Sequence, residues 1–559
     1  IYSKDRCNIT QNNIVDNGCG IWFSNSSNNS VSENEIAKNS FGIYVDDSYN
    51  NGIYKNNVTA NNEAGIHLGS SSYNDIFGND ITNNRDYGIS LYSSNHNNIA
   101  GNNVTGSKYF GISLSGSSDN MLRSNIMIGN GYNFHASGIN DVDASNTVDG
   151  KPIYYWINRR YETVPLDAGY VALVNCTNII AKNLTLAKNF NGILLAYTNH
   201  TIISGNNITN NYHGIGLFKS SNNTIYRNNI TNNEYGLEIR YSSRNSISAN
   251  NVIANKGFGV WVWSSSDTAI LGNNITAHIW DGISIGNSSY NTVSENNIVN
   301  NRHGVELSYY SNNNTVSGNN VTANYKYGIA IDLYTYPTSS SNNVIYHNNF
   351  IDNTKHVYSN NLTNVWDDCY PSGGNYWSDY TGSDMYSGVN QNETGHDWIG
   401  DSPYIINGNN IDRYPLMYPF VLEMEEIRIA YRNLLLKYSA LLYDFETLNL
   451  TLYILLNNMT ELREQIDAIN STFQMLIDDL KNRVDLLNST LQMSVGKLQG
   501  QYNSLNSTLT SGQQTITNEL VTLRNLMYFL IATTIILIVT TVYSAIRKPK
   551  ARTRATRKT

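Results

Sequence analysis

Apolar and polar residues alternate over short segments along the first two thirds of the chain, and these segments recur at a fixed interval. A Gly followed by an aliphatic residue, with a second aliphatic residue two positions later, returns every 22 or 23 residues in most repeats. In the repeat that begins at Gly214, Ile215 and Leu217 fill these positions, and Ile225 and Ile230 follow in two shorter segments. Period-two alternation between Asn-, Ser- and Gly-rich turns predicts strands. A fixed interval of this length predicts a solenoid.

The repeat predicts an all-β fold, a right-handed parallel β-helix of about 14 coils of 22–24 residues with three short strands each. A leucine-rich repeat of similar length needs an L-x-x-L-x-L pattern, which the repeats lack. We expect the β-helix over residues 1–365, with an insertion at 148–168, and N-terminally truncated because the chain begins in the middle of a coil. The glycines that mark the coils are Gly20, Gly42, Gly65, Gly88, Gly111, Gly138, Gly169, Gly192, Gly214, Gly236, Gly259, Gly282, Gly304 and Gly328.

The hexapeptide NNITNN starts at Asn206 and again at Asn228, one repeat later. In stacked coils, equivalent residues lie above one another, about 4.8 Å apart. We therefore expect Ile208 and Ile230 to point into the solenoid and the Asn residues to occupy its corners. Asn tolerates left-handed backbone angles, and stacked Asn amides can hydrogen-bond along the axis as a ladder.

The hydrophobic period changes after residue 420. Steps of four and three residues connect Leu434 to Leu480, which is the heptad pattern of a coiled coil. Extra steps of four interrupt the heptads further on, which predicts a nearly straight helical stalk over residues 421–525. A lone helix would expose this seam to water, so we expect the stalk to form a homo-oligomer.

Residues 527–546 contain no charged side chain and are long enough to cross a bilayer. The tail 547–559 follows with Lys and Arg and no acidic residue. The positive-inside rule places this tail in the cytoplasm and the rest of the chain outside. The sequence thus predicts a single-pass protein of the cell membrane whose bulk is extracellular.

Composition narrows the possible partners. The formal net charge is −8 over 559 residues, so no general affinity for nucleic acid is expected. The four Cys residues form no C-x-x-C pair, which argues against a zinc site, although Cys7 and Cys19 are placed to pair within one coil. We expect no cofactor, with calcium as the one metal that the chain suggests.

Two segments differ from the regular coils and carry a more specific resemblance to a known family. They are VDGKPIYYWINRRYETVPLDAGYVALVNCTNI, residues 148–179, and GGNYWSDYTGSDMYSGVNQNETGHDWIGDSPYIINGNNIDRYPLM, residues 373–417. With the coils, they resemble the NosD-type repeat family of carbohydrate-binding and sugar-hydrolase β-helices, in its membrane-anchored archaeal form. The resemblance covers roughly residues 1–417. The copper-site maturation known of the name-giving proteins is not expected, because no Met/His/Cys cluster has copper-ligand spacing.

The resemblance includes residues 366–420, which we expect to cap the open end of the β-helix, where the last coil would otherwise expose strand edges. In proteins with a similar segment, its middle is often an acidic Asp-Gly run suited to calcium. Here the run is GHDWIGDSP, with fewer acids. Asp384, Asp397 and Asp401 remain the calcium candidates.

Outward positions of the strands after each Gly carry aromatic and charged residues. Trp261 and Trp263 should stand side by side, about 6.5–7 Å apart along one strand. Aromatic rings stack on the apolar faces of sugars, and charged groups bind hydroxyls, so this face is the candidate ligand-binding site. A solvated face with incidental aromatics is the alternative. The candidate ligand-binding residues are Phe218, Glu238, Arg240, Trp261, Trp263 and Glu306.

No catalytic residue is assigned from the sequence. Glycoside cleavage requires two carboxyl groups about 5–9.5 Å apart, whereas Glu238 and Glu306 should lie three coils apart. Asp281 and His303 on adjacent coils are the nearest acid–base pair, and a corner position explains both. The aromatic and basic insertion around Tyr154–Tyr161 should leave the solenoid as a hairpin or loop, where it either shields one face or walls a binding groove.

Surface recognition of glycans or envelope polymers is the leading function. A polysaccharide lyase, hydrolase or epimerase is the enzymatic alternative, and a structural component of the cell envelope is a third. Activity against a polysaccharide panel separates an enzyme from a binder, and a glycan array separates a binder from a structural component.

Overall fold

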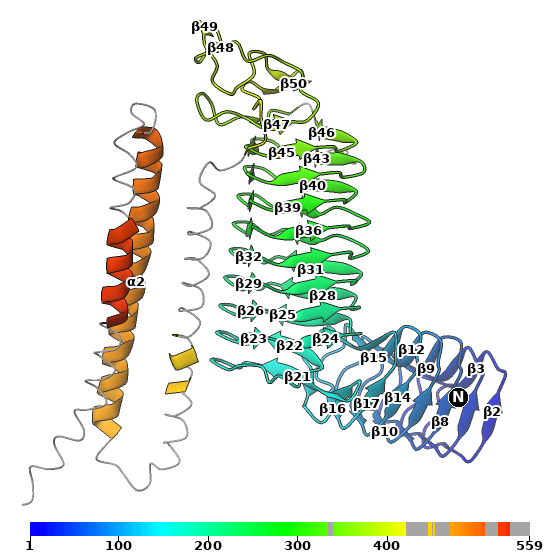
Figure 1. Ribbon diagram of the computed structural model, residues 1–559. Coiled ribbons are helices and arrows are strands. Elements are labelled where there is room, and N and C mark those ends of the chain that lie inside the picture. The colour runs from blue at the N-terminus through cyan, green and yellow to red at the C-terminus, as the bar shows by residue number, and fades with distance from the viewer. Residues whose placement is uncertain are drawn as a thin grey trace, which may run out of the picture. The chain divides into compact units, whose positions relative to one another are not determined.

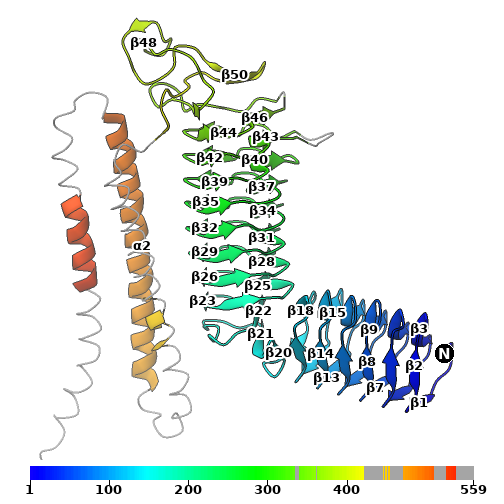
Figure 2. The ribbon, with the colours of Figure 1, turned by 45° about the vertical axis from the view of Figure 1, so that its right-hand side comes forward.

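The computed structural model describes residues 1–333, 339–360, 362–420, 445, 447–449, 451–452, 470–508 and 524–536. The chain divides into two compact units, Ile1–Leu442 and Tyr443–Thr559. Parallel strands in two consecutive stacks make up most of the first unit, and the stack changes direction between them (Figures 1 and 2). The solenoid has about 16 turns.

Three parallel sheets form the first stack. The first contains β1 (Asn8–Thr10), β4 (Ser30–Ser32), β7 (Gly52–Tyr54), β10 (Asp75–Phe77), β13 (Asn98–Ala100), β16 (Met121–Arg123) and β19 (Asp141–Val142). The second contains β2 (Asn13–Val15), β5 (Glu35–Ala37), β8 (Asn57–Thr59), β11 (Asp80–Thr82), β14 (Asn103–Thr105), β17 (Ile126–Ile128) and β20 (Thr147–Val148). The third, with longer strands, contains β3 (Cys19–Ser24), β6 (Phe41–Asp46), β9 (Ala64–Gly69), β12 (Tyr87–Tyr92), β15 (Phe110–Ser115) and β18 (Tyr132–Ala136).

The second stack repeats this plan. Its front sheet, the one with the longer strands, contains β21 (Lys151–Ile157), β22 (Tyr170–Val174), β25 (Asn191–Ala196), β28 (His213–Phe218), β31 (Tyr235–Arg240), β34 (Val260–Trp263), β37 (Ile283–Gly286), β40 (His303–Ser308), β43 (Tyr327–Ile331) and β46 (Lys355–Ser359). Another contains β23 (Ile180–Lys182), β26 (Ile202–Ser204), β29 (Thr224–Tyr226), β32 (Ser246–Ser248), β35 (Ala269–Leu271), β38 (Thr292–Ser294), β41 (Thr315–Ser317) and β44 (Val344–Tyr346). The last contains β24 (Thr185–Ala187), β27 (Asn207–Thr209), β30 (Asn229–Thr231), β33 (Asn251–Ile253), β36 (Asn274–Thr276), β39 (Asn297–Val299), β42 (Asn320–Thr322), β45 (Asn349–Ile351) and β47 (Tyr376–Trp377).

The Asn residues of the repeated hexapeptide have different roles. Asn206 is buried, and its backbone N–H donates to Oδ1 of Asn228 one coil further on, at 3.0 Å. Asn211 is buried in the same way and donates to Asn233. Asn210 has the left-handed φ of 57° at the turn, and Ile208 is fully buried. The predicted inward Ile and the predicted ladder are therefore confirmed, and the ladder and the left-handed turn use different Asn residues.

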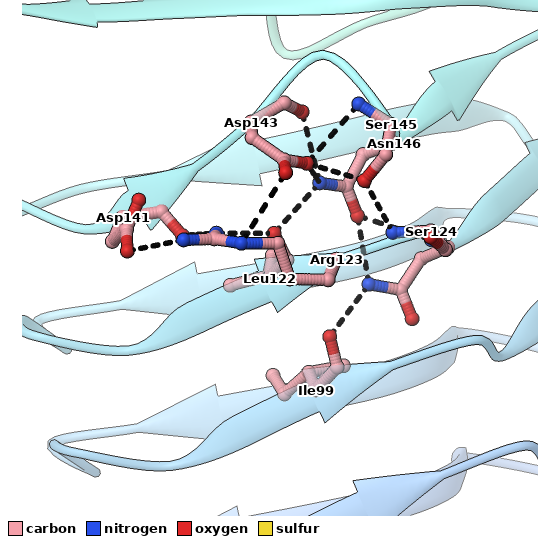
Figure 3. Close-up of polar contacts among 9 residues, drawn as sticks. Ile99, Leu122, Arg123, Ser124, Asp141, Asp143, Ser145 and Asn146 are labelled. Carbon is pink, nitrogen blue, oxygen red and sulfur yellow. Dashed lines mark hydrogen bonds and ion pairs between the residues drawn. The ribbon is translucent and has the colours of Figure 1, made fainter.

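Figure 3 shows the end of the first stack. Arg123 of β16 forms ion pairs with Asp141 and Asp143 of the following coil. Asn146 closes one ladder, because its Oδ1 accepts from Nδ2 of Asn125 at 2.8 Å while its own Nδ2 donates to the backbone oxygen of Leu122. These contacts satisfy the polar groups where regular stacking ends.

One strand joins the two stacks. Side chains of β22 are buried on both faces of the strand. Val171 and Leu173 belong to the core of the second stack, whereas Tyr170, Ala172 and Val174 belong to the core of the first. The two cores therefore meet at β22, one on each face of the strand.

Two expectations about this corner are wrong. Gly138 does not mark a coil, because β18 lies ahead of it and Gly138 follows in a turn at φ +98°. Asn133 takes the place of the glycine in β18, and so the glycine pattern does not reveal this strand. The insertion does not leave the solenoid either: β21 pairs in parallel with β22 and antiparallel with β20, and so starts the second stack.

Residues 366–416 lie on the last coil and include β48 (Tyr386–Ser387), β49 (Glu393–Thr394), β50 (Tyr404–Asn407) and β51 (Asn410–Asp412). Trp377 is buried and stacks on Phe350 of β45, with 4.6 Å between ring centroids, and on Tyr404 at 4.3 Å. The segment also ends two ladders. Asn410 accepts from the backbone N–H of Asn364, and Asp412 accepts from that of Asn375.

The second unit contains α2 (Asn470–Thr508) and a further helical segment over 524–536. Among the described residues, no helix is long and apolar enough to cross a membrane. Residues 537–546 of the predicted membrane segment lie outside the described residues, as does most of the predicted heptad seam. In α2, half-buried apolar side chains recur at Leu480, Val484, Leu487, Leu491 and Leu498, whereas Leu486, Met493 and Val495 are exposed.

Candidate functional site

Four of the six predicted ligand-binding residues lie together on the outer face of the front sheet. In register, Glu238 of β31 pairs with Trp261 of β34, and Arg240 pairs with Trp263. Phe218 lies one coil before Arg240 and packs edge-on against Tyr197 and Tyr241. Glu306 lies two coils beyond Trp261 and belongs to a different cluster.

The indole rings of Trp261 and Trp263 have centroids 6.5 Å apart at an interplanar angle of 64°. Both side chains are half-buried. Gly286 of the next coil makes room for Trp263: a Cβ there would meet the indole ring at 2.6 Å. Tyr309 packs edge-on against Trp263, with 5.1 Å between ring centroids. Part of each ring is therefore fixed by packing, and part remains open to a ligand.

Aromatic side chains at or just before the start of the front-sheet strands surround Trp261. Phe258 lies 5.2 Å from it, and Tyr235 lies 6.0 Å from it. Trp280 extends this group, with its ring centroid 5.0 Å from that of Phe258 and 41% of the residue exposed. We call Tyr235, Phe258, Trp261, Trp263 and Trp280 the aromatic cluster.

A charged group lies directly beside the aromatic cluster. Nε of Arg240 lies 2.5 Å from Oε1 of Glu238, and Nε2 of His213 lies 3.0 Å from Oε2 of the same carboxylate. Burial raises the pKa of Glu238, and the positive charge of Arg240 opposes this increase. Burial lowers the pKa of His213 to about 3, so its imidazole is neutral at pH 7. Because the imidazole is neutral, Arg240 is the cation beside the Glu238 carboxyl group.

A second polar group, which the sequence revealed only in part, lies two coils further along. Nδ1 of His303 lies 2.8 Å from Oδ1 of Asp281, the pair expected from adjacent coils. The carboxyl group of Asp281 also hydrogen-bonds that of Glu306, and Ser284 Oγ donates to Glu306 Oε2 at 3.4 Å. Burial raises the pKa of both carboxyl groups, and each carboxyl further affects the other. The pair therefore shares one proton near neutral pH.

The sequence pattern did not reveal the pair of Asp281 and Glu306, because these two residues do not lie in the same column of outward positions. Asp281 precedes the glycine of its coil, and Glu306 follows the glycine of the next coil by two positions. A comparison of diagonal neighbours on adjacent coils would have found it.

The sequence reading did not recognise the corner between the stacks as a second aromatic surface. Phe190, just before β25, lies 4.1 Å from His135 of the first stack and stacks on Tyr212 at 4.8 Å. Tyr212 in turn lies 5.6 Å from Tyr235. Rings from both stacks thus form a continuous surface that reaches the aromatic cluster.

The calcium candidates have other roles. Asp384 accepts from the backbone N–H groups of Asp397 and Trp398, and Asp401 accepts from those of Met385 and Tyr386. In the part of the chain that the structure describes, no group of three or more His, Cys, Asp or Glu is placed to hold a metal ion. These carboxylates stabilise turns of the cap.

The cap also holds an open pocket of about 500 Å³, lined by residues 379–382 and 402–405. The four Cys residues are unpaired, including Cys7 and Cys19. Neither feature lies at the aromatic cluster.

The stacked parallel sheets define a right-handed parallel β-helix protein. Residues 130–275, 169–321 and 279–394 match the family model of the right-handed β-helix region, and residues 1–162 match that of the periplasmic copper-binding protein NosD. The two models together cover residues 1–394 and support a relationship to the NosD-type parallel β-helix repeat proteins. No curated protein matches the sequence significantly.

Solved structures with a similar fold are distant in sequence. A Dettilon tailspike protein is 15% identical with a TM-score of 0.27; the alignment covers 54% of this chain and 62% of the tailspike, less than two thirds of its length. A variant of the periplasmic alginate epimerase AlgG is 15% identical with a TM-score of 0.30, over 59% of this chain and 76% of the epimerase. The A-module of the Azotobacter vinelandii mannuronan C-5 epimerase AlgE4 is 13% identical with a TM-score of 0.27, over 59% and 88%. These similarities concern the fold alone.

Proposed function

We propose that this protein binds glycans or envelope polymers at the cell surface through the outer face of its front sheet. The observation that carries the proposal is the half-buried pair Trp261 and Trp263 beside the ion pair of Glu238 and Arg240. Large aromatic surfaces supply most of the binding energy at sugar sites, and a few fixed polar groups supply orientation. Both are present here within two neighbouring strands.

The geometry also favours a linear ligand. Successive coils lie about 4.8 Å apart, so a chain that runs along the stack meets a side chain of the front sheet at each coil. The aromatic cluster draws its members from three successive repeats. A polymer can therefore contact several rings at once, and the small gain from each contact adds up.

A glycan array on the purified full chain tests the proposal, with the double variant Trp261→Ala/Trp263→Ala beside wild type. We expect the variant to lose binding of every ligand that wild type retains. Tyr290→Ala is the matched control, because Tyr290 is 63% exposed and lies in a turn between β37 and β38, outside the front sheet. Equal binding by wild type and the double variant would reject this face as the site.

A polysaccharide lyase, hydrolase or epimerase is the second candidate, and the pair Asp281–Glu306 is the observation that favours it. Hydrogen-bonded carboxyl oxygens lie about 2.5–3.0 Å apart, closer than the 5–9.5 Å that glycoside hydrolysis requires. The pair therefore suits proton transfer better than hydrolysis. An assay of a polysaccharide panel for unsaturated or reducing ends distinguishes this activity from binding, and a purely structural role predicts neither signal.

We also propose that residues 421–525 form a helical stalk, that residues 527–546 anchor the protein in the membrane, and that residues 547–559 face the cytoplasm. The heptad seam, the uncharged segment and the basic tail support this arrangement. Protease treatment of intact cells tests it: a tag after residue 559 should survive, and the β-helix should be released. Release of the tag would reject the topology, and monomeric full chain in detergent would reject association through the stalk.

A further inference from the structure

Two kinds of Asn lie side by side in the coils, and they differ in the residue that follows two positions later. Two positions after the buried ladder residue Asn206 comes Ile208, which points into the core. Two positions after its neighbour Asn207 comes Thr209, and both of these side chains lie on the outer face of β27, because residues two apart share one face of a strand. Asn207 therefore begins an N-x-S/T motif, the acceptor for N-linked glycans, and Asn206 does not.

These motifs, which we call sequons, recur at the same place in coils of both stacks. In the described part of residues 1–420, none begins at a buried Asn, and none begins in a strand of the front sheet. Further sequons begin in turns, at Asn222 and Asn313 for example. The repeat thus keeps the acceptor side chains away from the core and from the candidate ligand-binding face. The sequons that begin at the first residue of β8, β14, β27, β30, β36 and β42 are those of Asn57, Asn103, Asn207, Asn229, Asn274 and Asn320.

In strand β36 the two outward residues of the sequon contact each other. Oγ1 of Thr276 donates to Oδ1 of Asn274 at 3.0 Å, and the residue between them, Ile275, is fully buried. Thr322 and Asn320 of β42 form the same bond at 3.2 Å. The two residues that define the motif therefore lie together on the outer face of the sheet, and only the middle residue belongs to the core.

We infer that N-linked glycans are attached at this column of Asn residues, on the outer face of the sheet that contains β27, β30, β36 and β42, and leave the front sheet free for its ligand. In the reaction, Nδ2 of the Asn forms a bond to C1 of a sugar carried on a lipid phosphate; the bond between C1 and the phosphate oxygen breaks, the lipid phosphate leaves, and the amide loses one proton. The amide keeps one N–H, the number that Asn274 uses in its bond to Oδ1 of Asn251, at 2.7 Å. The inference rests on the proposed location of the β-helix outside the membrane, because this modification is found on secreted proteins.

Peptide mass spectrometry of the full chain, isolated from the cells in which it naturally occurs, tests the inference because it identifies each Asn that carries a sugar. We expect a sugar mass on Asn274 and on Asn320. Asn297 is the internal control: it occupies the same position one coil after Asn274, but Val299 replaces the Thr, so it should remain bare. If Asn274 and Asn320 are both bare, the inference is overturned. A sugar on Asn297 would overturn it too, because attachment would then not follow the sequon.

The variant Thr276→Val should lose the sugar from Asn274, because it removes the hydroxyl of the sequon and keeps a branched side chain of similar shape. Thr292→Val is the matched control. It removes a half-buried hydroxyl from β38, where Tyr290 stands two positions earlier in place of an Asn, and it should leave Asn274 modified. Sugar retained at Asn274 in Thr276→Val would contradict the inference.

These results are separate from the tests of the proposed function and topology. A chain that binds the glycan array but carries no sugar at this column overturns the present inference alone. A chain that carries sugar there but binds nothing on the array overturns only the binding proposal. Release of the C-terminal tag by protease from intact cells, with no sugar on the chain, overturns the proposed topology and this inference together.

Discussion

The guanidinium group of Arg240 lies over the indole ring of Trp261, with 4.3 Å between Cζ and the ring centroid. The same guanidinium contacts Glu238 on its own strand. Arg240 therefore holds the aromatic ring and the carboxylate in one fixed arrangement before any ligand arrives. Preorganisation of this kind reduces the entropy lost on binding.

Replacement of Arg240 by Lys should weaken glycan binding although it keeps the charge. The ammonium group of Lys lacks the flat surface that stacks on an indole ring and cannot bind a carboxylate through two parallel bonds. We expect a loss of about three- to tenfold in affinity, or about 1 kcal/mol. Titration of a glycan identified on the array measures the loss, and Arg244→Lys, in an exposed turn, serves as the control. Equal affinities for wild type and Arg240→Lys would contradict this role.

Ile230→Asp tests the register of the coils. Ile230 is fully buried in the core of the second stack, and an unpaired carboxylate at this position should cost several kcal/mol. Asn229→Asp places the same group on the neighbouring exposed position of β30 and should change stability by less than about 1 kcal/mol. Thermal unfolding followed by circular dichroism distinguishes the two. Similar midpoints for both variants would mean that the assigned register is wrong.

Asn228→Ala should be far more damaging than Asn229→Ala, although both remove one Asn from the same hexapeptide. Oδ1 of Asn228 accepts from the backbone and side chain of Asn206, and its Nδ2 donates to Asn250. Each buried group left without a partner costs about 1–3 kcal/mol. The side chain of Asn229 also hydrogen-bonds the equivalent Asn residues of the coils before and after, but it does so at an exposed position, where water can replace these bonds. We expect the two free energies of unfolding to differ by about 3 kcal/mol, and equal values would show that the ladder contributes little.

The stability of the β-helix should fall as the pH rises from about 7 to 8. Burial and the neighbouring carboxyl of Asp281 raise the pKa of Glu306 from 4.5 to about 8. The native state therefore holds a proton that the unfolded chain has released, so the unfolding free energy decreases with pH in this interval, by up to about 1.4 kcal/mol per unit. The histidines act below this range, because burial lowers the pKa of His213 and His303 from 6.5.

Glu306→Gln should reduce this dependence, because the amide does not titrate; the slope that remains is expected from Asp412, whose pKa burial raises to about 7. Unfolding midpoints measured in steps between pH 6.5 and 8.5 provide the comparison. Glu295→Gln is the control: it removes a carboxylate at a turn outside the front sheet. A slope in Glu306→Gln equal to that of wild type would show that Glu306 is not the group that titrates.

Asp412 offers a test of the cap. Its carboxylate accepts from the backbone N–H of Asn375 and from the indole N–H of Trp377, at 2.8 and 2.9 Å. Asp412→Ala leaves these buried donors without a partner and should cost about 3 kcal/mol. Asp412→Asn keeps an acceptor where the ladder elsewhere uses Asn, and should cost much less. If both variants lose the same amount, the last coil does not depend on this acceptor.

Much of the solenoid could be predicted because stacking repeats the same physical requirement at each coil. Ile208 and Ile230 recur for this reason. The glycine at the start of most front-sheet strands recurs as well, since a Cβ on Gly214 would lie 2.5 Å from the backbone oxygen of Gly236. Where the chain turns the corner, this requirement changes. Asn133 replaces the glycine there, and β21 arises from a segment without the repeat.

Within the candidate site, the sequence predicted only which residues occupy equivalent outward positions on successive coils. Glu238, Arg240, Trp261 and Trp263 occupy the positions expected from the register. The partial burial of the two Trp rings depends on residues in the turns, whose spacing varies between coils. Phe258 and Tyr309 are such residues, and no alternation pattern determines where their side chains lie.

The strand β22 has a mechanical consequence. Stacked repeats ordinarily unfold from their ends, one neighbour after another, because each coil contacts only the next. Val171 and Tyr170, adjacent in sequence, are buried in different cores, so β22 cannot separate from one stack without opening the other. Unfolding that starts at either end of the solenoid should therefore pause at the corner until both cores open together. Strand β22 thus limits how far the chain extends when it is pulled from its ends.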